Sequence, residues 1–106
     1  MEEGPNLSYV MAIANNDAEF KKHFVHRLKE EFLWEVGMYL RHIKRNEPRS
    51  AAEIVTKLKY KIDMLDMKKS YYFTAIFEEN LRVGDDSEHE QFKNILQKIG
   101  VFLKEV

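Results

Sequence analysis

The sequence predicts an all-α protein, an antiparallel four-helix bundle with a short additional helix at its N-terminus. Apolar residues recur at steps of three or four along several segments, as the buried faces of helices require. Only four glycines and two prolines occur in the 106 residues, which is too few for the many turns of an all-β fold. The breaks between the periodic segments are short, and short connections favour antiparallel neighbours. We therefore expect residues 1–106 to form a single bundle domain.

The first two predicted helices are separated by a polar stop. Two helical turns are expected over Leu7–Ala14, and the run Asn15-Asn16-Asp17 then ends this helix and starts a long one. Pro48 disfavours helical geometry at the residue before it, so the long helix should stop near Asn46. The apolar stripe of the long helix consists of Phe20, Phe24, Leu28, Phe32, Val36, Tyr39 and Ile43.

Three further helices follow. The third should start at or just before Ser50, where the spacing of a capping box occurs, and should continue to a break at Asp66-Met67. The fourth is expected over Lys68–Val83, with Gly84 in a left-handed conformation after it. The capping-box spacing recurs at Ser87-Glu88-His89-Glu90, before the final helix. The apolar stripe of the third helix is Ala51, Ile54, Val55, Leu58, Ile62 and Leu65, and that of the fifth is Phe92, Ile95, Leu96, Ile99, Phe102, Leu103 and Val106.

Composition and charge narrow the possible functions. The formal net charge is -1, so nothing electrostatic favours nucleic acid or an anionic membrane as the partner. The chain contains no cysteine, which removes thiol catalysis and cysteine-ligated metals from consideration. No apolar run reaches membrane-spanning length and the N-terminus is acidic rather than signal-like, so a soluble, cytoplasmic protein is expected.

The histidines and paired carboxylates do not form a recognisable catalytic pattern. A di-metal site in a helical bundle requires Glu-x-x-His pairs, and none occurs among His23, His26, His42 and His89. The adjacent pairs Glu30-Glu31 and Glu78-Glu79 point about 100° apart on a helix, so neither pair is aimed at one substrate atom. We interpret these carboxylates as solvated charge, and we expect no metal, no cofactor and no enzymatic activity.

The third predicted helix has the most informative outer face. With Leu58 at the centre of the buried face, Thr56 lies roughly 160° away from it. The residues Ala52, Lys59, Tyr60 and Asp63 share this outer side. The helix should therefore present a small, partly basic surface with Thr56 at its centre.

This stretch resembles the histidine-containing phosphotransfer (HPt) domains of phosphorelays. In that family a helix of the four-helix bundle carries His-x-Leu-Lys-Gly, followed some residues later by Leu-Gly. The present chain reads Thr56-Lys57-Leu58-Lys59-Tyr60 and then Leu65-Asp66. The resemblance covers most of the chain, and it includes Asn16-Asp17-Ala18-Glu19-Phe20 at the start of the long helix and Ala51-Ala52 before the motif. It implies a signalling domain that exchanges phosphoryl groups with receiver-domain aspartates.

Three departures from the HPt motif change the expected chemistry. Thr56 stands at the phosphohistidine position, and Tyr60 and Asp66 replace the two glycines. A threonine hydroxyl lacks the nucleophilicity and the labile phosphoramidate that relay transfer requires. The resemblance therefore implies a pseudo-phosphotransfer module that binds a receiver domain or another signalling protein without catalysis. The expected docking residues surround Thr56 and are Ala52, Lys57, Lys59, Tyr60 and Asp63.

Other functions remain open. The run His26-Arg27-Leu28-Lys29 also spells His-x-Leu-Lys, so an active phosphotransfer protein could use this or another histidine. Thr56 could also have replaced a site histidine by engineering. A different possibility is an unrelated helical adaptor or oligomerisation bundle, for which Leu33 and Trp34, both outside the main stripe, could form the contact surface.

Overall fold

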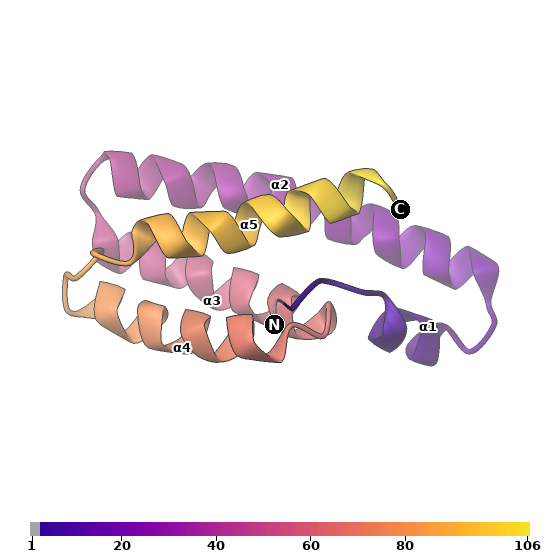
Figure 1. The fold of residues 1–106 in the computed structure, drawn as a ribbon. Coiled ribbons are helices and arrows are strands. Elements are labelled where there is room, and N and C mark those ends of the chain that lie inside the picture. The colour runs from indigo at the N-terminus through magenta and orange to yellow at the C-terminus, as the bar shows by residue number, and fades with distance from the viewer. Residues whose placement is uncertain (1–2) are drawn as a thin grey trace.

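The computed structural model describes residues 3–106, and these residues form five α-helices and no strand (Figure 1). The prediction of an all-α protein is thereby confirmed. None of the helices formed by these residues has the combination of length and apolar character that crossing a bilayer requires. The helices are α1 (Ser8–Ala14), α2 (Ala18–Lys44), α3 (Pro48–Met64), α4 (Lys68–Arg82) and α5 (His89–Lys104).

Polar residues and left-handed backbone conformations mark the starts and ends of helices where the sequence indicated breaks. The side chain of Asp17 accepts a hydrogen bond of 3.0 Å from the backbone N–H of Phe20 and so caps α2. The residues that follow α2, α3 and α4 reverse the chain with positive φ angles, which are 56° at Asn46, 61° at Asp66 and 90° at Gly84. Glycine adopts this conformation without steric cost, and Asn and Asp tolerate it better than other residues.

The two predicted capping boxes do not form. Helix α3 begins at Pro48, whose fixed φ suits the first helical turn, and it has no side-chain cap. Helix α5 begins at His89, also without a side-chain cap. The backbone N–H of Ser87 instead donates to the Asp85 carboxylate over 2.9 Å, in a local turn before the helix.

Helix α3 occupies the middle of the arrangement and packs against both α2 and α4 (Figure 1). Helix α1 packs against α2, and the segment before α1 reaches the junction of α3 and α4. There the backbone N–H of Asn6 donates to the carbonyl of Leu65 over 3.0 Å. The two long sides of α3 are therefore both covered by other helices, and this arrangement determines which of its residues remain exposed.

The hydrophobic core is continuous from α2 to α5. Tyr39 of α2, Phe77 of α4 and Phe92 of α5 are buried, and their ring centroids lie 5.0–6.3 Å apart. The whole predicted stripe of α3 is buried as well, namely Ala51, Ile54, Val55, Leu58, Ile62 and Leu65. The facing of α3 toward the core was therefore predicted correctly.

The long α2 stripe is only partly buried. Leu28, Phe32 and Tyr39 lie in the core, whereas Phe20 is exposed and stacks on Phe24 at a ring separation of 6.0 Å. Helix α2 has 27 residues and α3 has 17, so at 1.5 Å per residue α2 exceeds α3 in length by roughly 15 Å. Its first turns therefore extend beyond the end of α3, and the short α1 packs against α2.

Candidate functional site

The side of α3 that carries Ala52 and Thr56 faces α4 rather than solvent. Ala52 has no exposed surface at all, so the expectation that it lies on the outer side was wrong. Ala52, Thr56 and Lys59 share one face of the helix, because they follow one another at steps of four and three. Thr56 and Lys59 both contact Glu78 of α4, and this face is therefore the one that packs on α4.

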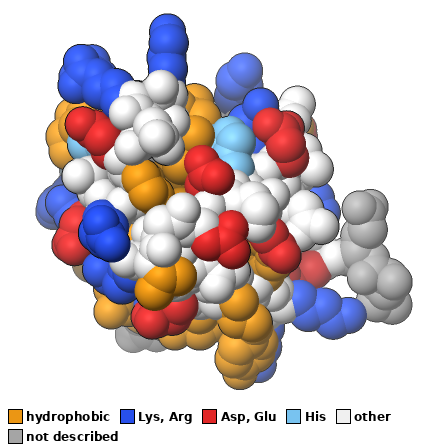
Figure 2. All heavy atoms as spheres, turned by 90° about the vertical axis from the view of Figure 1, so that its left-hand side faces the viewer, with side chains coloured by type: hydrophobic (Ala, Val, Ile, Leu, Met, Phe, Trp, Pro, Cys, Tyr) orange, Lys and Arg blue, Asp and Glu red, His pale blue; other side chains and the backbone are white. Residues whose placement is uncertain are grey.

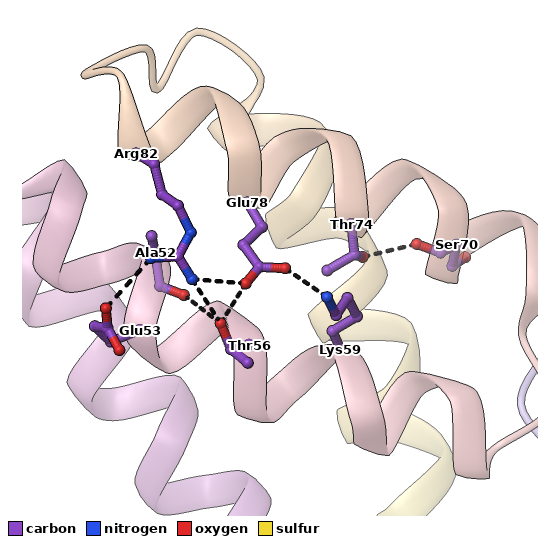
Figure 3. Close-up of polar contacts among 8 residues, drawn as sticks. All are labelled: Ala52, Glu53, Thr56, Lys59, Ser70, Thr74, Glu78 and Arg82. Carbon is purple, nitrogen blue, oxygen red and sulfur yellow. Dashed lines mark hydrogen bonds and ion pairs between the residues drawn. The ribbon is translucent and has the colours of Figure 1, made fainter.

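Thr56 is partly buried between α3 and α4 (Figure 3). Its hydroxyl hydrogen-bonds the carboxylate of Glu78, and its oxygen lies 3.1 Å from the backbone carbonyl of Ala52 one turn earlier. The hydroxyl oxygen also accepts a hydrogen bond of 3.1 Å from Arg82. A hydroxyl has one proton to donate, so both its donor and its acceptor capacity are used inside the protein.

Glu78 is the centre of this polar network. Its side chain is 7% exposed, and both carboxylate oxygens are hydrogen-bonded. One oxygen accepts from Lys59 over 2.7 Å, and the other accepts from Thr56 and from Arg82, the latter over 2.9 Å. Arg82 extends the network to the exposed Glu53 over 3.3 Å. We call Thr56, Lys59, Glu78 and Arg82 the Glu78 network.

The charges of the network keep Glu78 ionised. Burial tends to raise the pKa of this carboxyl, but hydrogen bonds from Lys59, Thr56 and Arg82 outweigh burial and hold the pKa below its ordinary value. The hydrogen bond to Glu78 in turn raises the pKa of Lys59. A carboxylate with a lowered pKa is a weak general base, so Glu78 is poorly suited to activate the Thr56 hydroxyl.

Three of the predicted docking residues remain on the open face of α3. Lys57, Tyr60 and Asp63 are exposed, whereas Lys59 is turned toward α4. The ammonium group of Lys57 lies 5.8 Å from the ring centroid of Trp34 on α2, and that of Lys59 lies 5.6 Å from the ring of Tyr60. The structure thus separates the five predicted docking residues into an open group and a pair, Ala52 and Lys59, that packs toward α4.

The interpretation of Glu78 as solvated charge was wrong, and a usable signal was present in the sequence. Thr74, Glu78 and Leu81 are all buried and follow one another at steps of four and three, so Glu78 occupies a core position of α4. Its spacing of four residues to Arg82 also fits an ion pair along the helix. Neither signal identifies Thr56 and Lys59 as the partners on the neighbouring helix.

The four histidines lie apart and each has a partner. His23 and His26 are exposed on α2. His23 lies 3.7 Å from Glu19, one turn earlier, and His26 lies 3.1 Å from Glu30, one turn later. The Nδ1 atom of His42 lies 2.9 Å from Glu47, and that of His89 lies 2.6 Å from the hydroxyl of Tyr39. Over residues 3–106, no group of three or more acidic or histidine side chains is placed to hold a metal ion.

Charges of both signs are interspersed on the end of the molecule that carries the α2–α3 and α4–α5 connections (Figure 2). This face shows no continuous basic surface, and binding to a phosphate backbone would require such a surface.

No model of a known protein family matches the chain, and searches of curated proteins and of solved structures likewise find no match.

The lowered pKa of Glu78 leads to a prediction about pH. The stabilisation from Glu78 is fully present above the ordinary carboxyl pKa of 4.5 and is lost as the pH falls through the lowered folded-state value. Glu78→Gln should lower the free energy of unfolding at pH 7 by about 1–2 kcal/mol. The difference from wild type should shrink as the pH falls through the lowered pKa of Glu78, because protonation removes the charge that the network stabilises. Urea melts at pH 7 and pH 3 measure both effects.

The neighbouring exposed residue supplies the control for this prediction. Glu79→Gln should leave the stability nearly unchanged at both pH values. Some acid sensitivity should survive in Glu78→Gln, because the pKa values of Glu3, Glu31 and Asp85 are also lowered. A Glu78→Gln variant as stable as wild type at pH 7 would contradict the role of Glu78 as the centre of the network.

Proposed function

We propose that the chain is a non-catalytic, HPt-like signalling module that binds a receiver-type protein. In this proposal the four long helices α2–α5 constitute an antiparallel bundle, and α3 carries the position at which an HPt domain is phosphorylated. The open part of the docking face consists of Lys57, Tyr60 and Asp63, beside Thr56.

The observation that carries the proposal is the state of the Thr56 hydroxyl. It stands at the phosphohistidine position of the resemblance and is held between Glu78 and Arg82 inside the protein. Phosphoryl transfer needs a nucleophile that is free to attack and a base or a labile product that permits turnover. Thr56 has no imidazole nitrogen, and its carboxylate neighbour Glu78 is a weak general base because its pKa is lowered. The position therefore supports binding rather than relay chemistry.

A second function, active phosphotransfer, is favoured by one observation on α2. His26 lies on the exposed side of the helix and Leu28 is buried, so the run His26-Arg27-Leu28-Lys29 has the inside and outside pattern that the HPt motif needs. The ring of His26 lies beside Glu30, which belongs to the same helix. In this second function, His26 would accept the phosphoryl group in place of Thr56.

Exposure of large apolar residues on α2 favours the third function, oligomerisation. Leu33 and Trp34 are both more than half exposed, and Leu40 lies further along the same helix with part of its surface open. Such a stripe suits contact with another helical surface. A mass that rises with protein concentration would favour this function over receiver docking.

Incubation with phosphorylated receiver domains tests these functions together. The unmodified chain should acquire no acid-labile phosphate, while calorimetry should detect binding to at least one receiver. Tyr60→Glu should weaken that binding about tenfold or more, because an aromatic contact is replaced by a charge that faces the acidic receiver pocket. Tyr72→Glu, at another exposed tyrosine on α4, is the matched control and should bind normally.

Two results would overturn the proposal. Acid-labile labelling of the unmodified chain, lost in His26→Ala, would establish active phosphotransfer instead. Absence of binding to every receiver, together with a mass that increases with concentration and falls on Leu33→Glu, would establish oligomerisation.

A further inference from the structure

A hollow of about 660 Å³ lies between α2 and α3. Trp34 of α2 and Tyr60 of α3 line it with rings that are each 56% exposed. The single tryptophan of the chain thus stands at the edge of this hollow. Exposed aromatic rings beside a hollow favour a ligand with a flat or cationic group.

The charged lining of the hollow is unbalanced toward the acidic side. Three carboxylates, Glu30, Glu31 and Glu35, face two ammonium groups, Lys57 and Lys61. Lys61 is shared by two of these acids, at 3.1 Å from Glu31 and 3.0 Å from Glu35. Its hydrogen bond is the main reason that the pKa of Glu31 is lowered. Glu31 has a second cationic partner in Arg27 at 3.4 Å, whereas the ion pair of Glu35 is with the shared Lys61.

Glu35 contributes a carboxylate oxygen with unused acceptor capacity to the lining. Its side chain is 7% exposed, and its Oε2 atom accepts from Lys61. Its Oε1 atom is buried, and within residues 3–106 no group donates a hydrogen bond to it. A buried carboxylate oxygen without a donor is costly, and such a group in a folded protein calls for a partner that completes it.

From these features we infer that the hollow binds the guanidinium group of an arginine side chain presented by a partner peptide. A planar guanidinium can stack on an aromatic ring and still direct N–H donors at carboxylates in its plane. Trp34 and Tyr60 supply the rings, and Glu31 and Glu35 supply the acceptors. An ammonium group, which has compact geometry and strong hydration, uses such a combination less well.

Lys57 partly occupies the same aromatic surface. Its ammonium group lies 5.8 Å from the Trp34 ring centroid, which is within the range of a cation–π contact. Arginine binding must therefore compete with an internal cation. Removal of this cation should strengthen binding, whereas removal of an acceptor should weaken it. The hollow shares Lys57 and Tyr60 with the proposed docking face, but arginine binding is tested with peptides in the absence of any receiver.

Intrinsic fluorescence of Trp34 tests the inference directly. The probe is the blocked tripeptide acetyl-Gly-Arg-Gly-amide, and its neutral counterpart contains citrulline in place of arginine. The arginine peptide should give a saturable change in Trp34 fluorescence. The citrulline peptide should bind at least about three- to fivefold more weakly. Glu31→Gln should weaken arginine binding by about three- to fivefold, and Lys57→Gln should tighten it. Glu79→Gln, on exposed α4 surface away from the hollow, should change nothing.

Nuclear magnetic resonance with the wild-type chain checks the location without any substitution, because the indole N–H of Trp34 should shift on titration with the arginine peptide. Three results would overturn the inference. These are the absence of a saturable signal, equal affinity for the citrulline peptide, and tighter binding of free spermidine than of the arginine peptide. The last result would assign the hollow to small polyamines rather than to a peptide guanidinium.

Discussion

Ala52→Lys should destabilise the fold by about 3–5 kcal/mol. Ala52 is completely buried on the face of α3 that packs on α4. A lysine there would add a long side chain to a filled space and place its charge near Arg82, which already belongs to the Glu78 network. Because small domains have only about 5–15 kcal/mol of stability, much of the chain should be unfolded at modest urea concentrations.

The matched control for this substitution is Ala12→Lys. Ala12 is exposed in the middle of α1, so the same change of residue should alter stability by less than about 0.5–1 kcal/mol. Urea melts followed by circular dichroism measure both variants. A wild-type melting profile for Ala52→Lys would show that α4 does not cover this face of α3, and the Glu78 network would then have to be abandoned.

Leu58→Ala should lower the free energy of unfolding by about 2–5 kcal/mol. Leu58 has no exposed surface and belongs to the continuous core, where removal of three side-chain carbons leaves a cavity that rigid helices cannot fully close. The same substitution at Leu33, on the exposed side of α2, should cost no more than about 0.5–1 kcal/mol.

The pair of leucine variants is measured by denaturant titration of each purified protein, with the slope of unfolding compared as well as the midpoint. Equal losses at Leu58 and Leu33 would mean that Leu33 is buried in solution, for example in a dimer. That result would favour the oligomerisation function over the arrangement of core and surface described above.

Helix positions were largely predictable because their signals are local. Asp17, Asn46 and Gly84 act within a few residues of their own positions, and each marks a helix boundary in the structure. The capping boxes predicted at Ser50 and Ser87 did not form, because other local signals lie beside them. Pro48 begins α3, and a turn closed by Asp85 precedes α5.

The candidate site was predictable only in part. Periodicity correctly placed Leu58 in the core and Tyr60 at the surface. It placed Ala52 and Glu78 at the surface, although both are buried. A helical wheel divides the residues of one helix into core and solvent positions and does not take account of contacts with a second neighbouring helix. An alanine is compatible with either environment, so its burial depends on whether another helix approaches.

Buried charge was the feature least visible in the chain. Glu35 follows Leu28 and Phe32 at steps of seven and three and precedes Tyr39 by four, so it occupies a core position of α2. A glutamate at such a position is normally interpreted as surface charge, because ionised side chains are rarely buried unless they are paired. Its partner Lys61 is 26 residues away on α3, beyond the reach of any local pattern.

The sequence alone therefore determined the helical class, the approximate helix boundaries and the core face of α3, since all three follow from spacing along the chain. It also placed Thr56 outside the apolar stripe of α3. Only the tertiary structure decided that this threonine is bonded to Glu78, that Ala52 is covered and that Glu35 is left with an unpartnered oxygen. These properties depend on which helices lie side by side, and contacts between residues far apart in the chain arise only when the helices pack.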